Sequence, residues 1–359
     1  MRKQTMESGE LRVSGESLQD FTQEVFVRVG LPIEDAKIVA KVLIWANLRG
    51  VDSHGVQRVP QYLERVGNGL MNAQPNIRIV GETSATVLIE ADRALGPVVT
   101  TFAMEQVIGK ARNTGVGWGF VRNTTHQGAI GYYSFMAAEK AMAGICWVCS
   151  LPNMAPYGAR AGGVDNSPIA IGIPSKHGRP LILDIATSVA AAGKLQVAID
   201  RSEMIPIGWA LDTQGNPTTD PQCAAILLPV GGHKGYGLAF MLECLTSLMV
   251  GNPIALPTLL TEEIAPPAGS HTDQNSVVIA INIGSFTNVE RYKQHVDNFV
   301  DVLKALPKAK GFDEIFVPGE IEDRVYEKRS QHGIPLPQGT VRKLRDVAQQ
   351  LNIRLPAGL

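Results

Sequence analysis

Seven consecutive residues, Asp52 to Arg58, place a carboxylate, a hydroxyl, an imidazole and a guanidinium directly before an apolar-spaced segment. Arg58 offers a planar donor fork that binds carboxylates, and His54 titrates near neutral pH and so transfers protons. Asp52 and Ser53 are typical cap or turn residues, and Pro60 predicts either a helix start near Arg58 or a kink. The segment therefore predicts either an acid-binding, proton-transferring site or a capped helix whose His54 and Arg58 face water.

A second histidine, His126, follows a predicted strand and precedes Gly128 and Gly131. Polar residues between a strand end and a helix start commonly form active sites, and residues 123–125 (Asn-Thr-Thr) occupy that position. An imidazole that exchanges a proton near neutral pH suits the interconversion of an alcohol and a ketone. The alternative is a loop histidine that caps the next helix.

The glycine-rich run at 231–237 surrounds His233 and Lys234 just before an apolar helix. Free backbone N–H groups and the positive helix end would favour an anion such as a phosphate, and a flexible turn before a core helix is the alternative. Neither this run nor GVGWG at 115–119 has the spacing of a Walker loop or a dinucleotide fingerprint.

Two further stretches carry polar groups. Residues 150–174 are rich in turn-forming Pro, Gly and Asn, and we interpret them as an ordinary surface loop before a strand. The strand at 179–188 carries Asp184 and ends in Thr187 and Ser188, whose oxygens suit a sugar; alternatively the acid caps the following helix.

A metal site is the rival enzyme interpretation. His54, His126 and His233 with Asp184 could surround zinc, but no HxH or HExxH spacing supports this. The sequence therefore predicts no metal.

Composition narrows the functional classes. The 359 residues carry a net charge of -1 and 45% hydrophobic residues, as in a soluble globule, and no basic run interleaves with aromatics. No apolar stretch reaches membrane-spanning length, and the first 16 residues lack the apolar core of a secretory signal. Four scattered cysteines suit a reducing cytoplasm, and Cys146 and Cys149 lie in a strand-like run typical of core residues. We expect a cytoplasmic protein that binds neither nucleic acid nor membrane.

Hydrophobic periodicity predicts a mixed α/β fold. The pattern is helical from residue 14 to about 72, where Ser17 and the apolar spacing after it mark the first helix, and an exposed loop is expected at 266–275. Strands joined largely by loops favour a mixed sheet over a uniformly parallel one. Further helices are expected at 33–47, 97–111, 132–143, 288–306 and 338–351, and strands at 76–94 (two), 116–123, 144–150, 167–175, 179–188, 224–230 and 276–284.

Six motifs in chain order resemble the malate/L-lactate dehydrogenase family of the non-Rossmann type, over roughly residues 12 to 355. Relatives in that family include ureidoglycolate dehydrogenase, sulfolactate dehydrogenase, 2,3-diketogulonate reductase and Δ1-piperideine-2-carboxylate reductase. The motifs are DSHGVQR at 52–58, NTTHQGAIGYY at 123–133, PNMAPYG at 152–158, LDIATS at 183–188, GGHKGYGLAFMLE at 231–243 and VPGE at 317–320.

The resemblance implies an oxidoreductase that uses NAD or NADP, commonly as a homodimer. It implies a mixed NAD(P)-binding sheet flanked by helices, at 76–310, rather than a Rossmann domain. A helical N-terminal segment at 1–75 would pack with a C-terminal helical segment at 311–359 on the substrate side.

The resemblance also implies roles. His54 and His126, with Ser53 beside them, match the two histidines at the reacting carbon, one as acid/base and the other as orienter, and Arg58 matches the binder of the substrate carboxylate. Where relatives often have Gly-Thr-Asn-Pro, residues 165–168 are Asp-Asn-Ser-Pro. The positions that match cofactor contacts are Ser150, Asp184, Ile185, Ala186, His233, Lys234, Pro318, Gly319 and Glu320.

The expected substrate is a small 2-hydroxy or 2-oxo acid of malate or lactate type. A cyclic 2-imino acid, as in a Δ1-piperideine-2-carboxylate reductase, and ureidoglycolate share the same carboxylate end and stay open as alternatives. The non-enzymatic alternative is a cofactor-binding scaffold without turnover.

Overall fold

The computed structural model describes residues 11–260 and 274–359, so most of the loop expected at 266–275 lies outside the described residues. The chain forms two compact units. We call residues 1–74 with 319–359 the terminal unit, and residues 75–318 the sheet unit. No helix within the described residues is long and apolar enough to cross a membrane.

The terminal unit is mainly helical. Its first helix is capped by Ser14, whose Oγ accepts the Ser17 N–H at 3.1 Å, and it begins at Gly15, in agreement with a helical pattern from residue 14. Its two strands, β1 and β12, pair antiparallel although they come from opposite ends of the chain. The elements are β1 (Leu11–Val13), α1 (Gly15–Arg28), α2 (Ile33–Leu48), η1 (Asp52–His54), η2 (Val56–Arg58), α3 (Val59–Gly67), α10 (Glu320–His332), β12 (Ile334–Leu336) and α11 (Gln338–Leu351).

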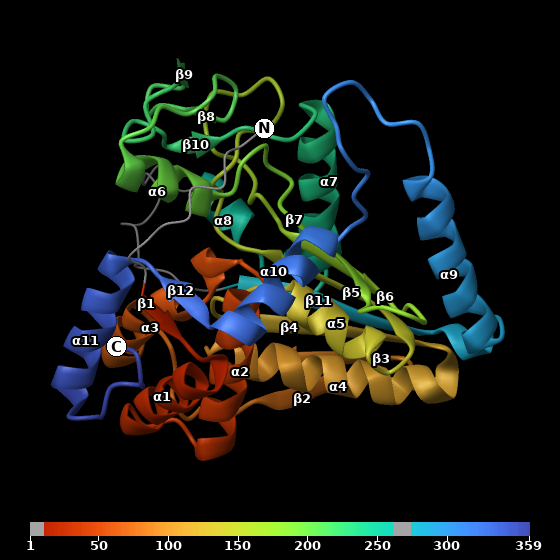
Figure 1. Ribbon diagram of the computed structural model, residues 1–359, viewed down its shortest axis with the longest axis horizontal. Coiled ribbons are helices and arrows are strands. Elements are labelled where there is room, and N and C mark those ends of the chain that lie inside the picture. The colour runs from red at the N-terminus through yellow and green to blue at the C-terminus, as the bar shows by residue number, and fades with distance from the viewer. Residues whose placement is uncertain (1–10, 261–273) are drawn as a thin grey trace. The chain divides into compact units, whose positions relative to one another are not determined.

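The sheet unit is built on a seven-stranded mixed sheet in the order β2-β3-β4-β11-β5-β6-β7, which confirms the predicted fold class (Figure 1). Its strands β3 and β4 run parallel, and the other neighbouring pairs are antiparallel. The strands are β2 (Arg78–Glu82), β3 (Thr86–Glu90), β4 (Val116–Thr124), β5 (Met142–Cys149), β6 (Ile169–Ile173), β7 (Leu181–Ile185), β8 (Ala210–Leu211), β9 (Pro217–Thr218), β10 (Ile226–Leu227) and β11 (Gln274–Asn282). The helices are α4 (Gly96–Thr114), α5 (Gly131–Ala138), α6 (Ala192–Arg201), α7 (His233–Glu243), η3 (Cys244–Leu248), α8 (Ala255–Leu260), η4 (Ile283–Ser285) and α9 (Val289–Lys304).

Helices α4 and α5 cover one face of this sheet, where glycines allow close approach. A Cβ on Gly117 would lie 2.1 Å from the Val107 carbonyl oxygen of α4, and one on Gly144 would lie 2.5 Å from the Ser134 carbonyl oxygen of α5. Helix α7 packs on the other face. Its core cluster there contains Trp147, Cys149, Leu242, Val277 and Ile279.

The two cysteines of the CxxC spacing lie on β5 and are buried and free. Side chains alternate between the faces of a strand, so residues three apart point to opposite faces. Cys149 lies in the cluster with Leu242, and burial raises the thiol pKa of both cysteines well above its usual range. The predicted core role is therefore confirmed.

Two element predictions are wrong in extent. The helix expected at 132–143 ends at Ala138, because Ala141 adopts a left-handed backbone (φ 59°) and β5 begins at Met142. The strand expected at 224–230 is reduced to Ile226–Leu227, which pairs with β8 in a small separate sheet. The helices expected at 33–47 and 338–351 are confirmed within one residue.

Candidate active site

The stretch from Asp52 to Arg58 forms two short 3-10 turns, η1 and η2, and α3 then begins at Val59 with Pro60 in its first turn. A helix start near Arg58 was one of the two expected outcomes. His54 and Arg58 thus belong to successive turns rather than to one helix face.

Buried polar contacts hold these turns. Asn47 on α2 donates from Nδ2 to Asp52 Oδ1 at 2.6 Å and accepts the Val56 N–H at 2.8 Å. Arg329 on α10 binds both oxygens of Asp52, at 2.7 and 2.9 Å. A Cβ on Gly55 would lie 2.2 Å from the Asn47 side chain, so this position requires glycine. Asp52 is therefore a structural residue that fixes the turn carrying its chemically active neighbours.

His54 is held next to Ser53, with Nδ1 2.9 Å from the Ser53 Oγ. Burial, reinforced by the nearby Arg58 guanidinium, lowers the pKa of His54 to about 4. The imidazole is therefore neutral near pH 7.

Arg58 is anchored within the same turn. Its Nε donates to the Ser53 carbonyl oxygen at 2.7 Å, and its Nη1 donates to Gln61 Oε1 at 2.8 Å. Each terminal guanidinium nitrogen carries two N–H bonds, so Nη1 and Nη2 keep donors for an end-on carboxylate.

His126 follows β4 in a tightly held loop. The Thr125 hydroxyl donates to the Ala94 carbonyl oxygen at 2.9 Å, and a Cβ on Gly96 would lie 2.5 Å from the His126 carbonyl oxygen. The Gly128 N–H donates to His126 Nδ1 at 3.3 Å. In the neutral ring the proton therefore sits on Nε2.

Asp184 on β7 does not cap the helix that follows it, as the sequence alternative had it. Its Oδ2 accepts the N–H of Gly131, the first residue of α5, at 2.8 Å. This bond joins the LDIATS motif to the segment that continues from His126.

The loop at 150–174 is not an ordinary surface loop, because Met154, Asp165 and Ser167 are buried. Burial raises the pKa of Asp165 to about 7. Hydrogen bonds from the Asn166 and Ser150 backbones and from the Asn153 side chain lower this pKa, but burial has the larger effect. Ser150 thus lies at a buried carboxyl group.

Asn153 and Asn166 connect this loop to β7. Asn153 donates to Asp165 Oδ1 at 3.0 Å and accepts the Asn166 N–H at 2.8 Å. Asn166 donates to the Ser188 Oγ at 3.3 Å, and its carbonyl oxygen accepts the Thr187 N–H at 2.9 Å. Neither Asn153 nor Asp165 is among the site residues predicted from the sequence, although polar residues among turn-forming ones were a signal for them.

The glycine-rich turn lies against the same segment, because a Cβ on Gly235 would lie 2.4 Å from the Thr187 carbonyl oxygen. Gly231 and Gly232 both have φ 61° and curl the turn back. The N–H groups of Lys234, Gly235 and Tyr236 therefore bond to carbonyls of residues 230–232. The expectation of several free N–H groups is wrong for these three, which leaves the side chains of His233 and Lys234 as donors for an anion.

The remaining predicted positions lie where the two units join in sequence. Pro318 ends the sheet unit, and Gly319 precedes α10 with a left-handed backbone (φ 84°). Its carbonyl oxygen accepts from Arg49, while Glu320 pairs with Arg324 at 2.6 Å.

The sheet unit therefore links Ser150, the Thr187–Ser188 end of the LDIATS motif and the start of α7 through one set of hydrogen-bonded loops. Asp184 bonds instead to the start of α5, and Ile185 and Ala186 lie between Asp184 and Thr187 in the motif. The terminal unit gathers Ser53, His54 and Arg58 on one pair of turns. Over residues 11–260 and 274–359, no group of three His, Cys, Asp or Glu could hold a metal ion.

Comparison with known proteins identifies relatives over nearly the whole chain. A sequence model described as malate/L-lactate dehydrogenase matches residues 13–345. The chain is 36% identical to a malate dehydrogenase of Pyrococcus abyssi over 354 residues, covering 96% of each. It is 39% identical to an L-sulfolactate dehydrogenase of Methanocaldococcus jannaschii, covering 92% of the chain and 95% of that protein. The crystal structure of malate dehydrogenase from Entamoeba histolytica superposes with a TM-score of 0.91 at 30% identity, covering 97% of the chain and 99% of that structure.

The lowered pKa of His54 predicts a pH-dependent stability. The folded protein binds the His54 proton only near pH 4, whereas the unfolded chain binds it near pH 6.5, so stability falls as the pH drops between these values. The loss is at most about 1.4 kcal/mol per pH unit. Asp165 acts with the opposite sign, because its raised pKa costs stability as the pH rises from about 4 to 7.

Denaturant unfolding of the wild type and His54→Gln at pH 7, 6 and 5 isolates the His54 contribution. We expect the free energy of unfolding of the wild type, relative to that of the variant, to decrease steadily as the pH is lowered from 7 to 5. Asp165→Asn serves as control, since it should change the slope in the opposite direction. If the difference in the free energy of unfolding between wild type and His54→Gln stays constant across this pH range, the pKa of His54 is not lowered as stated.

Proposed function

The chain belongs to the malate/L-lactate dehydrogenase family and is a 2-hydroxy acid dehydrogenase, and on this premise we propose how its residues act. The substrate is a malate- or lactate-like 2-hydroxy acid, and the product is the corresponding 2-oxo acid. One observation carries the proposal: a single pair of turns holds an imidazole and a guanidinium that is anchored through the Ser53 carbonyl oxygen. These are the groups that a 2-oxo acid needs at its two polar ends.

A nicotinamide cofactor follows from the family, and we propose NAD or NADP. The residues fit its polar parts, because the buried Thr187 Oγ1 has no hydrogen-bond partner within the described residues, and the Thr187 carbonyl oxygen lies against Gly235 at the start of α7, next to Lys234. Ser150, Asp184, Ile185, Ala186, His233 and Lys234 would hold the cofactor in the sheet unit, with Pro318, Gly319 and Glu320 as further contacts. When bound, the cofactor supplies or accepts a hydride at C2 of the substrate.

Arg58 binds the substrate carboxylate in this proposal. Its Nε and Nη1 bonds fix the guanidinium plane before substrate arrives, so little side-chain freedom is lost on binding. A charged planar fork also selects for acids over neutral alcohols.

His126 acts as the donor to the reacting oxygen, and His54 with Ser53 orients the substrate. In the reduction direction, the Nε2–H of neutral His126 donates a hydrogen bond to the substrate oxygen and stabilises the negative charge that develops there, and the alkoxide takes its proton from solvent. His54 takes the orienting role in this proposal, because its Nδ1 lies 2.9 Å from the Ser53 Oγ and its pKa of about 4 leaves it without a proton to give near pH 7.

The alternatives differ in the group that is reduced. A cyclic 2-imino acid would receive the proton on nitrogen at the same place, and ureidoglycolate presents the same carboxylate to Arg58. An assay at the nicotinamide absorbance over 2-oxo acids, cyclic imino acids and ureidoglycolate, with each cofactor, separates them. Binding of NADH or NADPH without turnover of any of these compounds would favour a scaffold protein.

We also propose a homodimer in the cytoplasm. Helix α9 has no buried residue, and Phe299, Val302 and Leu306, three or four apart, are exposed at 64, 63 and 50%. Exposed apolar faces of this kind mark protein interfaces. The buried free thiols of Cys146 and Cys149 suit a reducing compartment, and recovery of the protein outside the cytoplasm would contradict that location.

Replacing His126 by Ala should lower kcat about 10²- to 10⁴-fold, because the developing charge on the oxygen loses its donor. His54→Ala should lower kcat less, since the neutral ring only orients. Steady-state turnover of the best 2-oxo acid from the panel measures both. Equal losses, or unchanged turnover in both variants, would contradict the roles given to the two rings.

Arg58→Lys should raise KM for the 2-oxo acid by roughly tenfold or more, because a point charge cannot reproduce the two-pronged contact. Arg28→Lys, at an exposed position of α1 in the same unit, is the matched control and should leave KM unchanged. If Arg58→Lys has the same KM as the wild type, Arg58 does not bind the substrate carboxylate as proposed.

If α9 forms the dimer interface, Phe299→Glu combined with Val302→Glu should yield monomers in sedimentation equilibrium. Asp301→Lys changes the charge on another face of the same helix and should leave the dimer intact. A monomeric wild type, or a dimer that survives the double substitution, contradicts the proposed interface.

A further inference from the structure

Asn123 adopts a left-handed backbone (φ 57°) near the end of β4, three residues before His126. Among residues other than glycine, asparagine tolerates this region best, yet it still needs neighbours to hold it there. On the parallel neighbour β3, the chain also turns through left-handed residues after Glu90, at Asp92 and Arg93. The two strand exits therefore change direction side by side.

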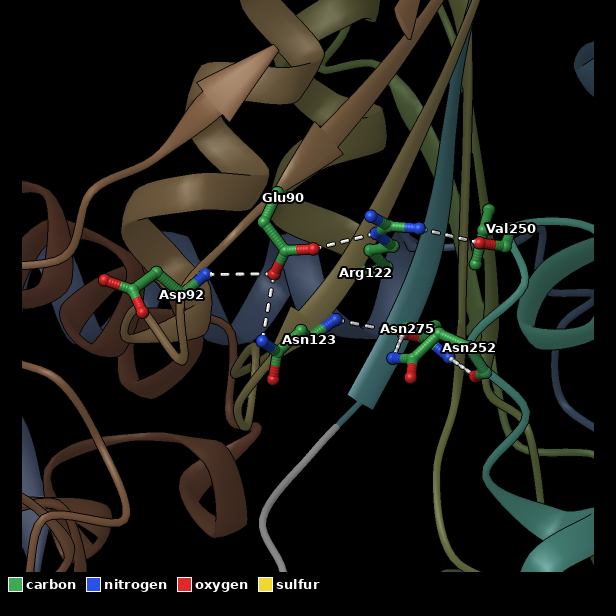
Figure 2. A network of polar contacts seen from close by, with 7 residues as sticks. All are labelled: Glu90, Asp92, Arg122, Asn123, Val250, Asn252 and Asn275. Carbon is green, nitrogen blue, oxygen red and sulfur yellow. Dashed lines mark hydrogen bonds and ion pairs between the residues drawn. The ribbon is translucent and has the colours of Figure 1, made fainter. Parts of the chain in front are cut away.

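A network of polar contacts binds these exits together, as Figure 2 shows. Asn123 donates from Nδ2 to Glu90 Oε1 at 2.9 Å, and its backbone N–H donates to Asn275 Oδ1 at 3.1 Å. Its carbonyl oxygen accepts the Arg93 N–H at 2.8 Å. The backbone N–H, carbonyl and side chain of Asn123 are thus each bonded to a different residue.

Two of the three partners of Asn123, Glu90 and Asn275, are themselves fixed. Arg122 donates to Glu90 Oε2 at 2.8 Å and to the Val250 carbonyl oxygen at 3.1 Å. Asn275 on β11 is buried, accepts from Asn252 Nδ2 at 3.0 Å and donates back to its carbonyl oxygen at 2.7 Å. Because the Glu90 carboxylate is ionic, its bonds are among the stronger kind.

The same strand exit also holds the residues between Asn123 and His126. Both Thr124 and Thr125 donate their hydroxyls to the Ala94 carbonyl oxygen, at 3.4 and 2.9 Å. Beyond His126, the Gln127 carbonyl oxygen accepts from Tyr133. The loop is therefore clamped on both sides of the histidine, and its direction is set where it leaves β4.

We propose that Asn123, held by Glu90 and Asn275, is a positioning residue for His126. It fixes the exit of β4 so that the Gly128 N–H meets Nδ1 and the ring keeps its proton on Nε2. This inference rests on the proposed role of His126 as donor to the substrate oxygen. Asn123 itself does not touch substrate in this scheme.

Asn123→Ala removes the bond to Glu90 and penalises the left-handed backbone, so the exit of β4 shifts. Displacement of a reacting group by about 1 Å costs on the order of 100-fold in rate. We expect kcat to fall roughly 10- to 100-fold while KM for the 2-oxo acid stays within about twofold. Asn123→Gly removes the side-chain bond but adopts the left-handed backbone without strain. Its kcat should therefore fall less than that of Asn123→Ala, and the variant should remain folded.

The matched control is Asn352→Ala in the terminal unit. Asn352 also has a left-handed backbone (φ 51°), at the end of α11, so its replacement carries a similar backbone penalty. It should lower the unfolding temperature as Asn123→Ala does, with kcat unchanged.

The direct readout is the ¹⁵N NMR spectrum of the histidine rings at one pH, with His126 identified by its loss in His126→Asn. Wild type and Asn352→Ala should show unprotonated Nδ1 and protonated Nε2 at His126, and both Asn123 variants should show a mixture of tautomers. Unchanged His126 resonances in a folded Asn123 variant overturn the positioning role, whatever its stability. A shifted tautomer without any effect of His126→Ala on turnover would instead overturn the proposed function.

Discussion

The parallel pairing of β3 with β4 is the constraint on which the histidine loop depends. Parallel strands bring their carboxyl ends to one edge of a sheet, and here that edge gathers Glu90 and Asn123. Antiparallel β11 adds Asn275 to the same edge. One carboxylate, Glu90 on β3, then accepts hydrogen bonds from Arg122 and Asn123 on β4, and His126 leaves the sheet from a braced position.

In the terminal unit, a partly buried ion pair holds the candidate residues. The Asp52–Arg329 pair and Asn47 fix a turn, and that turn carries Ser53, His54 and Arg58. Burial beside Arg58 keeps His54 uncharged near pH 7. A neutral imidazole adds no second cation beside the guanidinium, so Arg58 carries the positive charge of this pair of turns.

The sequence predicted the helices and strands that depend on the spacing of apolar residues along the chain. Apolar spacing placed the helix at 33–48 and the helix at 338–351 within one residue, and strand segments indicated a mixed sheet. The helix expected to reach Ala143 stopped early, because nothing in the composition marks the left-handed Ala141. Contacts between distant residues escaped prediction for a related reason. Pairing of β1 with β12, and of Asn123 with Glu90 and Asn275, joins positions with no fixed spacing. The residue types of His54, Arg58 and His126 indicated acid–base chemistry, and their roles came from the family resemblance.

The claim that this dehydrogenase moves a hydride from C2 of a 2-hydroxy acid is tested most directly by isotope transfer. The best 2-hydroxy acid substrate, deuterated at C2, is incubated with the oxidised nicotinamide cofactor, and the reduced cofactor is analysed by NMR. Direct transfer predicts deuterium on the nicotinamide ring, one atom for each substrate oxidised. Deuterium released to water, with none on the ring, would contradict it.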